Sequence, residues 1–166
     1  MPATEQGINL DRYMLVPRTL IFLTHEDKVL LLKGAGSKRI WSGLYNGVGG
    51  HVEQGEDILS AAERELREET GLSSLKLWLC GIMTVDTETN PGVGVFVFKG
   101  ESPEFSPAIS KEGALEWIEL SNLSTIPLVA DLPLLLPEIL AHKPGQSPFI
   151  AHSKYDESGN LSVNLK

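Results

Sequence analysis

Three glutamates stand close together near the end of one predicted helix. Glu65, Glu68 and Glu69 are spaced i, i+3 and i+4, so their side chains share one helical face and repel one another. They also lie in the last turns of the helix, where the helix dipole disfavours anions. Mg²⁺ would offset both costs, because it binds carboxylate oxygens and bridges to phosphate. For such a helix taken alone, a solvated acidic face is the alternative interpretation.

The residues around the glutamates favour metal binding. Gly50 and Gly55 predict a loop in which the backbone can approach a ligand closely. Asp57 is a candidate N-cap for a helix over residues 58–69, and Gly71 is a candidate residue to end it. Apolar residues at helical spacing predict a stripe that directs the carboxylate face away from the core. These apolar residues are Ile58, Leu59, Ala62 and Leu66.

The spacing of these residues is that of a known sequence motif, the Nudix box. Every specified position is filled in register: Gly50, Glu56, Arg64, Glu65, Leu66, Glu68, Glu69, Gly71 and Leu72. The chain therefore resembles the Nudix hydrolase family. The resemblance implies an α/β fold, the α/β/α sandwich of that family with a mixed β-sheet. We expect a single domain over residues 1–166.

The resemblance also implies roles for individual residues. Glu65, Glu68 and Glu69 would bind Mg²⁺, or Mn²⁺ in its place, together with the carbonyl of Gly50. Glu65 is the expected general base. Arg64 would hold Glu56 or a box glutamate in position, although a simple salt bridge on the helix is the alternative. A further metal-binding acid is expected after the box, at Glu112 or, as second choice, Glu116.

These groups suit the hydrolysis of a phosphoanhydride bond. Its oxygens repel nucleophiles, so hydrolysis needs their charge neutralised and a water activated, and metal ions do both. We expect conversion of a nucleoside triphosphate to its monophosphate and pyrophosphate, with an oxidised purine nucleotide as one candidate. Alternatives are a nucleoside diphosphate linked to a sugar or a second nucleotide, and a catalytically silent nucleotide-binding module. An isopentenyl diphosphate isomerase would share the fold but use a cysteine in the strand before the box. Cys80 follows the box, so this activity is disfavoured.

Resemblance to the 8-oxo-dGTP diphosphatase class, seen in residues 45–52 and 133–136, implies candidates for substrate binding. Asn46 would read the base, or would be a turn residue bonded to nearby backbone. Asp131 would do so from the loop before the second helix, or would only cap that helix. Three more candidates could equally pack or be solvated: Trp41 for the base, and Lys38 and Arg39 for phosphates.

The overall composition excludes some classes of binding partner. The chain has 166 residues and a net charge of −8, which argues against binding polymeric nucleic acid and leaves a small nucleotide as the expected partner. No apolar run approaches membrane-spanning length, so we expect a cytoplasmic protein without membrane contact. Cys80 lies in an apolar run and is expected to be buried. The oligomeric state stays open.

The remaining pattern predicts the elements that position these residues. Residues 1–11 are polar and expected to be flexible. Residues 24–28 separate two apolar strands and predict a hairpin, and Pro17 favours an irregular start or an edge position for the first strand. A second helix is expected over residues 131–141. Further strands are expected over residues 75–85, 93–99 and 114–120, and in a C-terminal extension, residues 144–166, over 149–155 and 161–165.

Overall fold

The computed structural model describes residues 5–35, 41–73, 75–103 and 113–166. Within these residues, eight strands form one sheet in the order β3-β2-β1-β5-β4-β7-β8, with β6 paired to β2. The strands are β1 (Leu15–His25), β2 (Lys28–Gly34), β3 (Tyr45–Asn46), β4 (Leu77–Asp86), β5 (Gly92–Glu101), β6 (Gly113–Glu119), β7 (Phe149–Tyr155) and β8 (Leu161–Leu165). The helices are α1 (Ile58–Thr70), the 3₁₀ helix η2 (Leu120–Thr125) and α2 (Leu132–Ala141).

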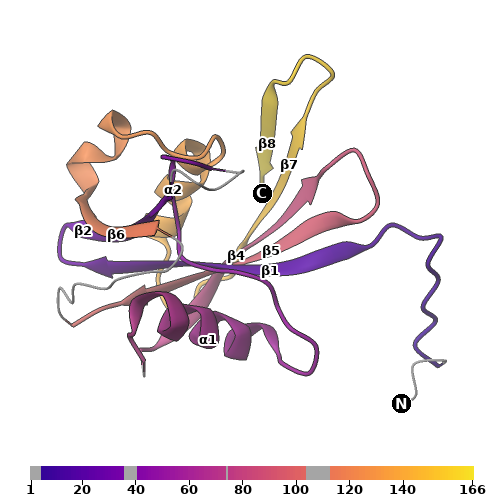
Figure 1. Ribbon diagram of the computed structural model, residues 1–166, viewed down its shortest axis with the longest axis horizontal. Helices are drawn as coiled ribbons and strands as arrows, with labels where there is room; N and C mark the ends of the chain where they lie inside the picture. The colour runs from indigo at the N-terminus through magenta and orange to yellow at the C-terminus, as the bar shows by residue number, and fades with distance from the viewer. Residues whose placement is uncertain (1–4, 36–40, 74, 104–112) are drawn as a thin grey trace.

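The sheet is mixed, as predicted. β1 pairs with β5 and β4 with β7 in parallel, while the other named pairs are antiparallel. The two long helices lie on opposite faces of this sheet (Figure 1). The expected α/β/α arrangement is therefore confirmed.

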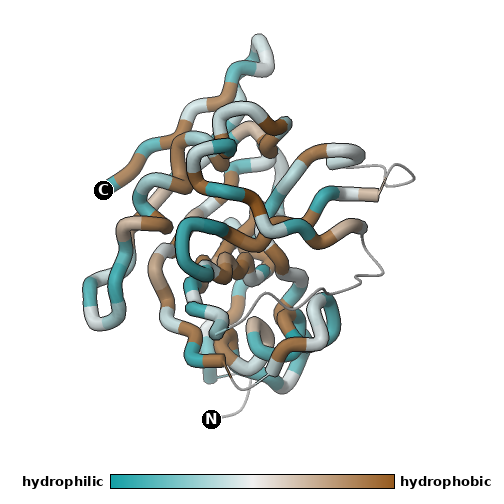
Figure 2. The backbone as a smooth tube through the Cα atoms, turned by 90° about the vertical axis from the view of Figure 1, so that its left-hand side faces the viewer, coloured by the Kyte–Doolittle hydropathy of each residue, from teal (hydrophilic) through white to brown (hydrophobic). Residues whose placement is uncertain are grey.

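Two apolar clusters hold the layers together. Ala62 and Leu66 of α1 pack with Ile21 and other residues of one sheet face. Side chains of α2 pack with Phe22 and its neighbours on the opposite face. Adjacent strand residues point to opposite faces, which explains why Ile21 and Phe22 join different clusters. Figure 2 shows that the hydrophilic stretches gather at the outer turns.

Some local predictions need correction. Leu59 does not belong to the buried stripe of α1, since 40% of its surface is exposed. β1 is not an edge strand, because it lies between β2 and β5 and Pro17 pairs with Gly94. The predicted hairpin is present, but it turns at residues 26–27, because residues 24, 25 and 28 belong to the strands. Pro17 pairs with Gly94 of β5 on one side, whereas β2 pairs with β1 only at Thr24 and His25, so the missing N–H falls where β2 does not reach.

The C-terminal strands and the second helix lie where the sequence predicts them. β7 and β8 pair in an antiparallel hairpin and extend the main sheet beside β4. Cys80 is fully buried, and burial raises the pKa of its thiol to about 12. Within the described residues, no helix is long and apolar enough to cross a membrane.

Candidate active site

Both ends of α1 are defined by local hydrogen bonds. The Asp57 carboxylate accepts the backbone N–H groups of Leu59 at 2.9 Å and Ser60 at 3.0 Å, which are donors that the helix leaves unpaired. At the other end Gly71 adopts φ of 73° and donates its N–H to the carbonyl of Arg67. Both predicted caps are confirmed. They fix the helix on which the box glutamates stand.

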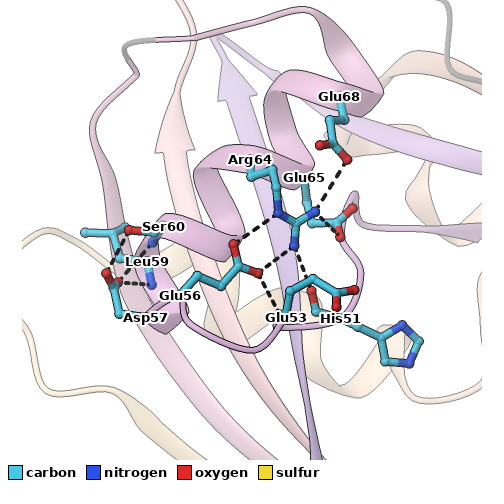
Figure 3. A network of polar contacts seen from close by, with 9 residues as sticks. All are labelled: His51, Glu53, Glu56, Asp57, Leu59, Ser60, Arg64, Glu65 and Glu68. Carbon is cyan, nitrogen blue, oxygen red and sulfur yellow. Dashed lines mark hydrogen bonds and ion pairs between the residues drawn. The ribbon is translucent and has the colours of Figure 1, made fainter.

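Arg64, in the middle of this helix, is the centre of a polar network (Figure 3). Its guanidinium makes two bonds to Glu56, from Nη2 at 2.7 Å and from Nε at 3.1 Å. Nη1 also contacts Glu65 at 2.9 Å and Glu68 at 3.4 Å, and Nη2 donates to the carbonyl of His51 at 3.0 Å. One cation thus joins three carboxylates and the glycine loop.

These contacts shift two ionisation equilibria. The hydrogen bond from Arg64 holds the pKa of the Glu56 carboxyl below its usual range. The same hydrogen bond, followed by that to Glu65, raises the pKa of the Arg64 guanidinium. Glu56 therefore stays an anion and Arg64 a cation. The pair is a fixed support for the box glutamates rather than a proton donor or acceptor.

The glutamate face does not point into solvent as expected. Glu69 is buried, with 8% exposed, and the Glu65 side chain is 15% exposed; only Glu68 is well exposed, at 55%. The Glu65 carboxylate lies directly against Gly50, where an added Cβ atom would collide with it. A side chain at Gly50 would therefore displace Glu65. This explains physically why the loop needs glycine at this position.

The oxygen ligands on α1 and at Gly50 suit a hard divalent cation. Glu65, Glu68 and Glu69 supply carboxylate oxygens, and the Gly50 carbonyl, which accepts Thr19 N–H at 2.9 Å, retains a second lone pair. Among the described residues, however, no three acidic or histidine side chains already converge as a metal site. Arg64 instead binds Glu65 and Glu68. The residues fit Mg²⁺ or Mn²⁺ chemically, and such an ion would compete with the guanidinium.

A cavity of about 480 Å³ adjoins the Glu65 carboxylate. Glu65 and Gly50 line it together with three predicted substrate-binding residues, Asn46, Trp41 and Asp131. The structure therefore brings the two predicted groups of residues into one site. Lys38, Arg39 and Glu112 lie outside the described residues.

Backbone bonds between β3 and the loop before α2 bring Asn46 and Asp131 to the same cavity. Tyr45 donates its N–H to Pro127 at 2.8 Å and accepts the N–H of Val129 at 3.0 Å. The Asn46 Oδ1 atom accepts the Gly47 N–H at 2.8 Å, so its side chain also stabilises the local turn. Its amide group is thereby held in a fixed orientation.

Asp131 occupies the N-cap position of α2, but its side chain makes no capping hydrogen bond. This argues against capping of α2 as the only role of Asp131. Burial raises the pKa of its carboxyl group. A carboxyl group that keeps its proton can donate a hydrogen bond as well as accept one.

Glu116 is unsuited to its second-choice role. Its neighbours Leu115 and Trp117 pack in the cluster on the α1 side, so Glu116 points to the opposite face of the sheet. There its carboxylate accepts the Tyr45 hydroxyl at 2.8 Å. Glu116 neither faces solvent freely nor lies with the glutamates of α1.

Arg18, Thr19 and Tyr155 are among the lining residues that the sequence did not predict. The guanidinium of Arg18 lies 5.7 Å from the ring centre of Trp41, which is 44% exposed and so is not core packing. Thr19 is buried, and its Oγ1 atom has no hydrogen-bond partner. Arg18 and Thr19 are polar residues in an otherwise apolar strand, a sequence feature that could have predicted their place in the cavity. Tyr155 lies far along the chain, and no sequence feature predicted that it lines the cavity.

Fold and site together define an α/β/α protein with a carboxylate-lined cavity closed by a glycine loop. The NUDIX domain model matches residues 14–139. The chain belongs to this family.

Two relatives have similar sequences over most of their length. The oxidized purine nucleoside triphosphate hydrolase of Mus musculus is 31% identical over 150 residues, covering 89% of this chain and 92% of the relative. The protein of the same name from Danio rerio is 33% identical, covering 75% of this chain and 80% of the relative. A solved structure of a MutT protein from Bacillus halodurans superimposes with a TM-score of 0.74 at 27% identity, covering 92% of this chain and 98% of that one.

Proposed function

We propose that this protein is a Mg²⁺-dependent hydrolase that converts a nucleoside triphosphate to its monophosphate and pyrophosphate. One observation carries the proposal: Glu65 and Gly50 line the same cavity as Asn46 and Asp131. A carboxylate for a metal ion and polar groups for a base would therefore face the same ligand. The two relatives named for oxidized purine nucleoside triphosphates support that substrate class.

Each residue at the glycine loop has a proposed task. Glu65, Glu68, Glu69 and the Gly50 carbonyl would hold the ion, which supplies charge neutralisation for the phosphates. Glu65 would also take the proton of the attacking water. Arg64 would position Glu65 through its 2.9 Å contact and anchor this arrangement to Glu56. Mn²⁺ has the same preference for oxygen ligands and is an expected substitute.

Asn46 and Asp131 are proposed to read the base. The amide of Asn46 offers a donor and an acceptor, with its oxygen already turned toward Gly47. The Asp131 carboxyl lines the same cavity and would form a hydrogen bond with the purine edge. The net charge of −8 supports a free nucleotide over a nucleic acid polymer. We also propose a cytoplasmic location, where such nucleotides are found.

A substrate panel tests this function. Purified protein with Mg²⁺ is given normal and oxidised nucleoside triphosphates, nucleoside diphosphate sugars and dinucleotides, with separate detection of pyrophosphate and phosphate. We expect pyrophosphate release from a triphosphate, and loss of that release in Glu65→Gln. Turnover confined to diphosphate sugars or dinucleotides would reject the triphosphate assignment. Full activity of Glu65→Gln would reject the role of the glutamate.

A further inference from the structure

The C-terminal hairpin forms part of the cavity wall. Ser153 and Tyr155 of β7 and Leu161 of β8 line the cavity together with residues of the central strands. Figure 1 shows this hairpin rising on the α2 side of the sheet. The family match ends at residue 139, so this wall lies outside the matched region. The hairpin is therefore a part of the site that the family pattern does not describe.

Strand register explains why these side chains face the cavity. In the parallel pair of β4 and β7, Val85 lies beside Ser153. Side chains alternate along a strand, so Tyr155 projects to the same face as Ser153. β5 continues this face, because Val93 lies beside Val85 and Val95 beside Met83. Met83, Val85, Val93 and Val95 thus form an apolar floor with Tyr155 at its border.

Tyr155 is an exposed aromatic ring at the end of this floor. Among the described lining residues, Tyr155, Trp41 and His51 carry aromatic rings. The Trp41 ring already contacts the guanidinium of Arg18. Tyr155 is 47% exposed, although burying an aromatic ring is favourable. A planar ligand on the aliphatic floor would cover this ring.

We propose that Tyr155 is a specificity-determining residue that packs against the nucleobase of the substrate. This inference rests on the proposed function, which puts a nucleoside triphosphate in the cavity. Phosphates at the Glu65 end leave the base to extend over the apolar floor. The hairpin would then select substrates by the size and planarity of their base, and would not affect the bond-breaking groups.

The experiment compares Tyr155→Ala and Tyr155→Phe with Ile150→Ala as a matched control. Ile150 is on the same strand with a similar exposure of 49%, but an odd number of residues away from Tyr155, so it points to the other face. KM and kcat are measured for nucleoside triphosphates. Calorimetry measures binding of a purine nucleoside monophosphate and, separately, of pyrophosphate. Thermal melting confirms that each variant is folded.

For Tyr155→Ala we expect KM and the monophosphate Kd to rise roughly 10-fold, the loss typical of one base–aromatic stack. We expect kcat and pyrophosphate binding to stay unchanged, and Tyr155→Phe and Ile150→Ala to behave as wild type. Unchanged monophosphate binding in Tyr155→Ala, or an equal loss of pyrophosphate binding, would overturn the inference. Calorimetry needs no turnover, so an inactive wild-type protein would reject the proposed function without deciding the role of Tyr155.

Discussion

The C-terminal ends of the two long helices handle charge in opposite ways. The last turns of α1 hold Glu65, Glu68 and Glu69, with Arg67 as the basic residue of the last turn. The last turn of α2 instead meets a buried lysine: Lys99 of β5 donates to the carbonyls of Leu140 at 2.6 Å and His142 at 3.1 Å. A cation at this end is favoured by the helix dipole, whereas anions are not.

The α2 end is also closed by a complete hydrogen-bond chain. The Lys99 Nζ atom lies 5.8 Å from the ring centre of Trp78, whose indole N–H donates to His142 Nδ1 at 3.2 Å. The other ring nitrogen of His142 lies 3.1 Å from the Ser147 carbonyl and must therefore donate to it. Burial lowers the pKa of Lys99, a cost that these bonds offset. This end of the molecule is built for stability.

The difference between the two helix ends separates charges that stabilise the fold from charges that are available to bind a ligand. Charges aligned with the helix dipole and fully bonded need no ligand. Charges placed against it gain from a ligand that neutralises them, and one of those on α1, Glu65, lines the cavity. Substitutions at the two ends should therefore separate activity from stability.

The largest effect is expected for Glu69→Gln at the α1 end. Loss of one carboxylate that stabilises charge in the reaction should lower kcat by about 100-fold or more. The melting temperature should fall little, because one source of repulsion with Glu65 disappears. Steady-state kinetics and thermal melting check both parts. Glu63→Gln, an exposed position on the same helix, is the control and should retain activity. Wild-type turnover in Glu69→Gln would refute the metal assignment.

At the α2 end the expected loss is in stability. Lys99→Met leaves the carbonyls of Leu140 and His142 without their donor, which should cost roughly 2 kcal/mol of unfolding free energy. Urea denaturation measures this, with Lys154→Met on the exposed side of β7 as control. Below the unfolding transition kcat should be unchanged. A stable but inactive Lys99→Met would show that the two ends are not separable.

Arg64→Lys tests whether the Arg64–Glu56 pair orients the glutamates that are proposed to bind the metal ion. Lysine offers a point charge in place of a planar fork, so it cannot join Glu56, Glu65 and Glu68 at once. We expect the Mg²⁺ concentration that gives half-maximal rate to rise roughly 10-fold, as for other residues that orient metal ligands. A metal titration of the rate gives the value, and Arg67→Lys is the control. An unchanged titration curve would mean that the Arg64 contacts are an ordinary surface salt bridge.

The smallest effect concerns the start of α2. Burial raises the pKa of Asp131 in the folded state, so folding favours its neutral form. Its ionisation therefore destabilises the fold as pH rises above the unfolded value of 3.8. Asp131→Asn should melt at a slightly higher temperature than wild type at pH 7, and the gap should close below pH 3.8. Triphosphate hydrolysis should decrease. A constant gap at all pH values would contradict a role for ionisation.

Much of the fold could be predicted because its signals are local. The caps Asp57 and Gly71 and the periodicity between them define α1 almost to the residue. Alternation of apolar residues and short polar turns predicted the hairpins, since these depend on neighbours in the chain. The errors came from contacts between distant residues: Glu116 bonds to Tyr45, and β1 pairs with the distant strand β5, which no local pattern reveals.

The amino-acid sequence by itself determined the family, the acidic face of α1 and the loop glycine, because residue type and spacing along one element suffice for these. Only the tertiary structure decided that Glu69 is buried, that Asp131 does not cap its helix, and that Tyr155 borders the cavity. The physical reason is that burial and partnership depend on which strands pair and in which register. That outcome depends on packing over the whole sheet, and a single segment does not encode it.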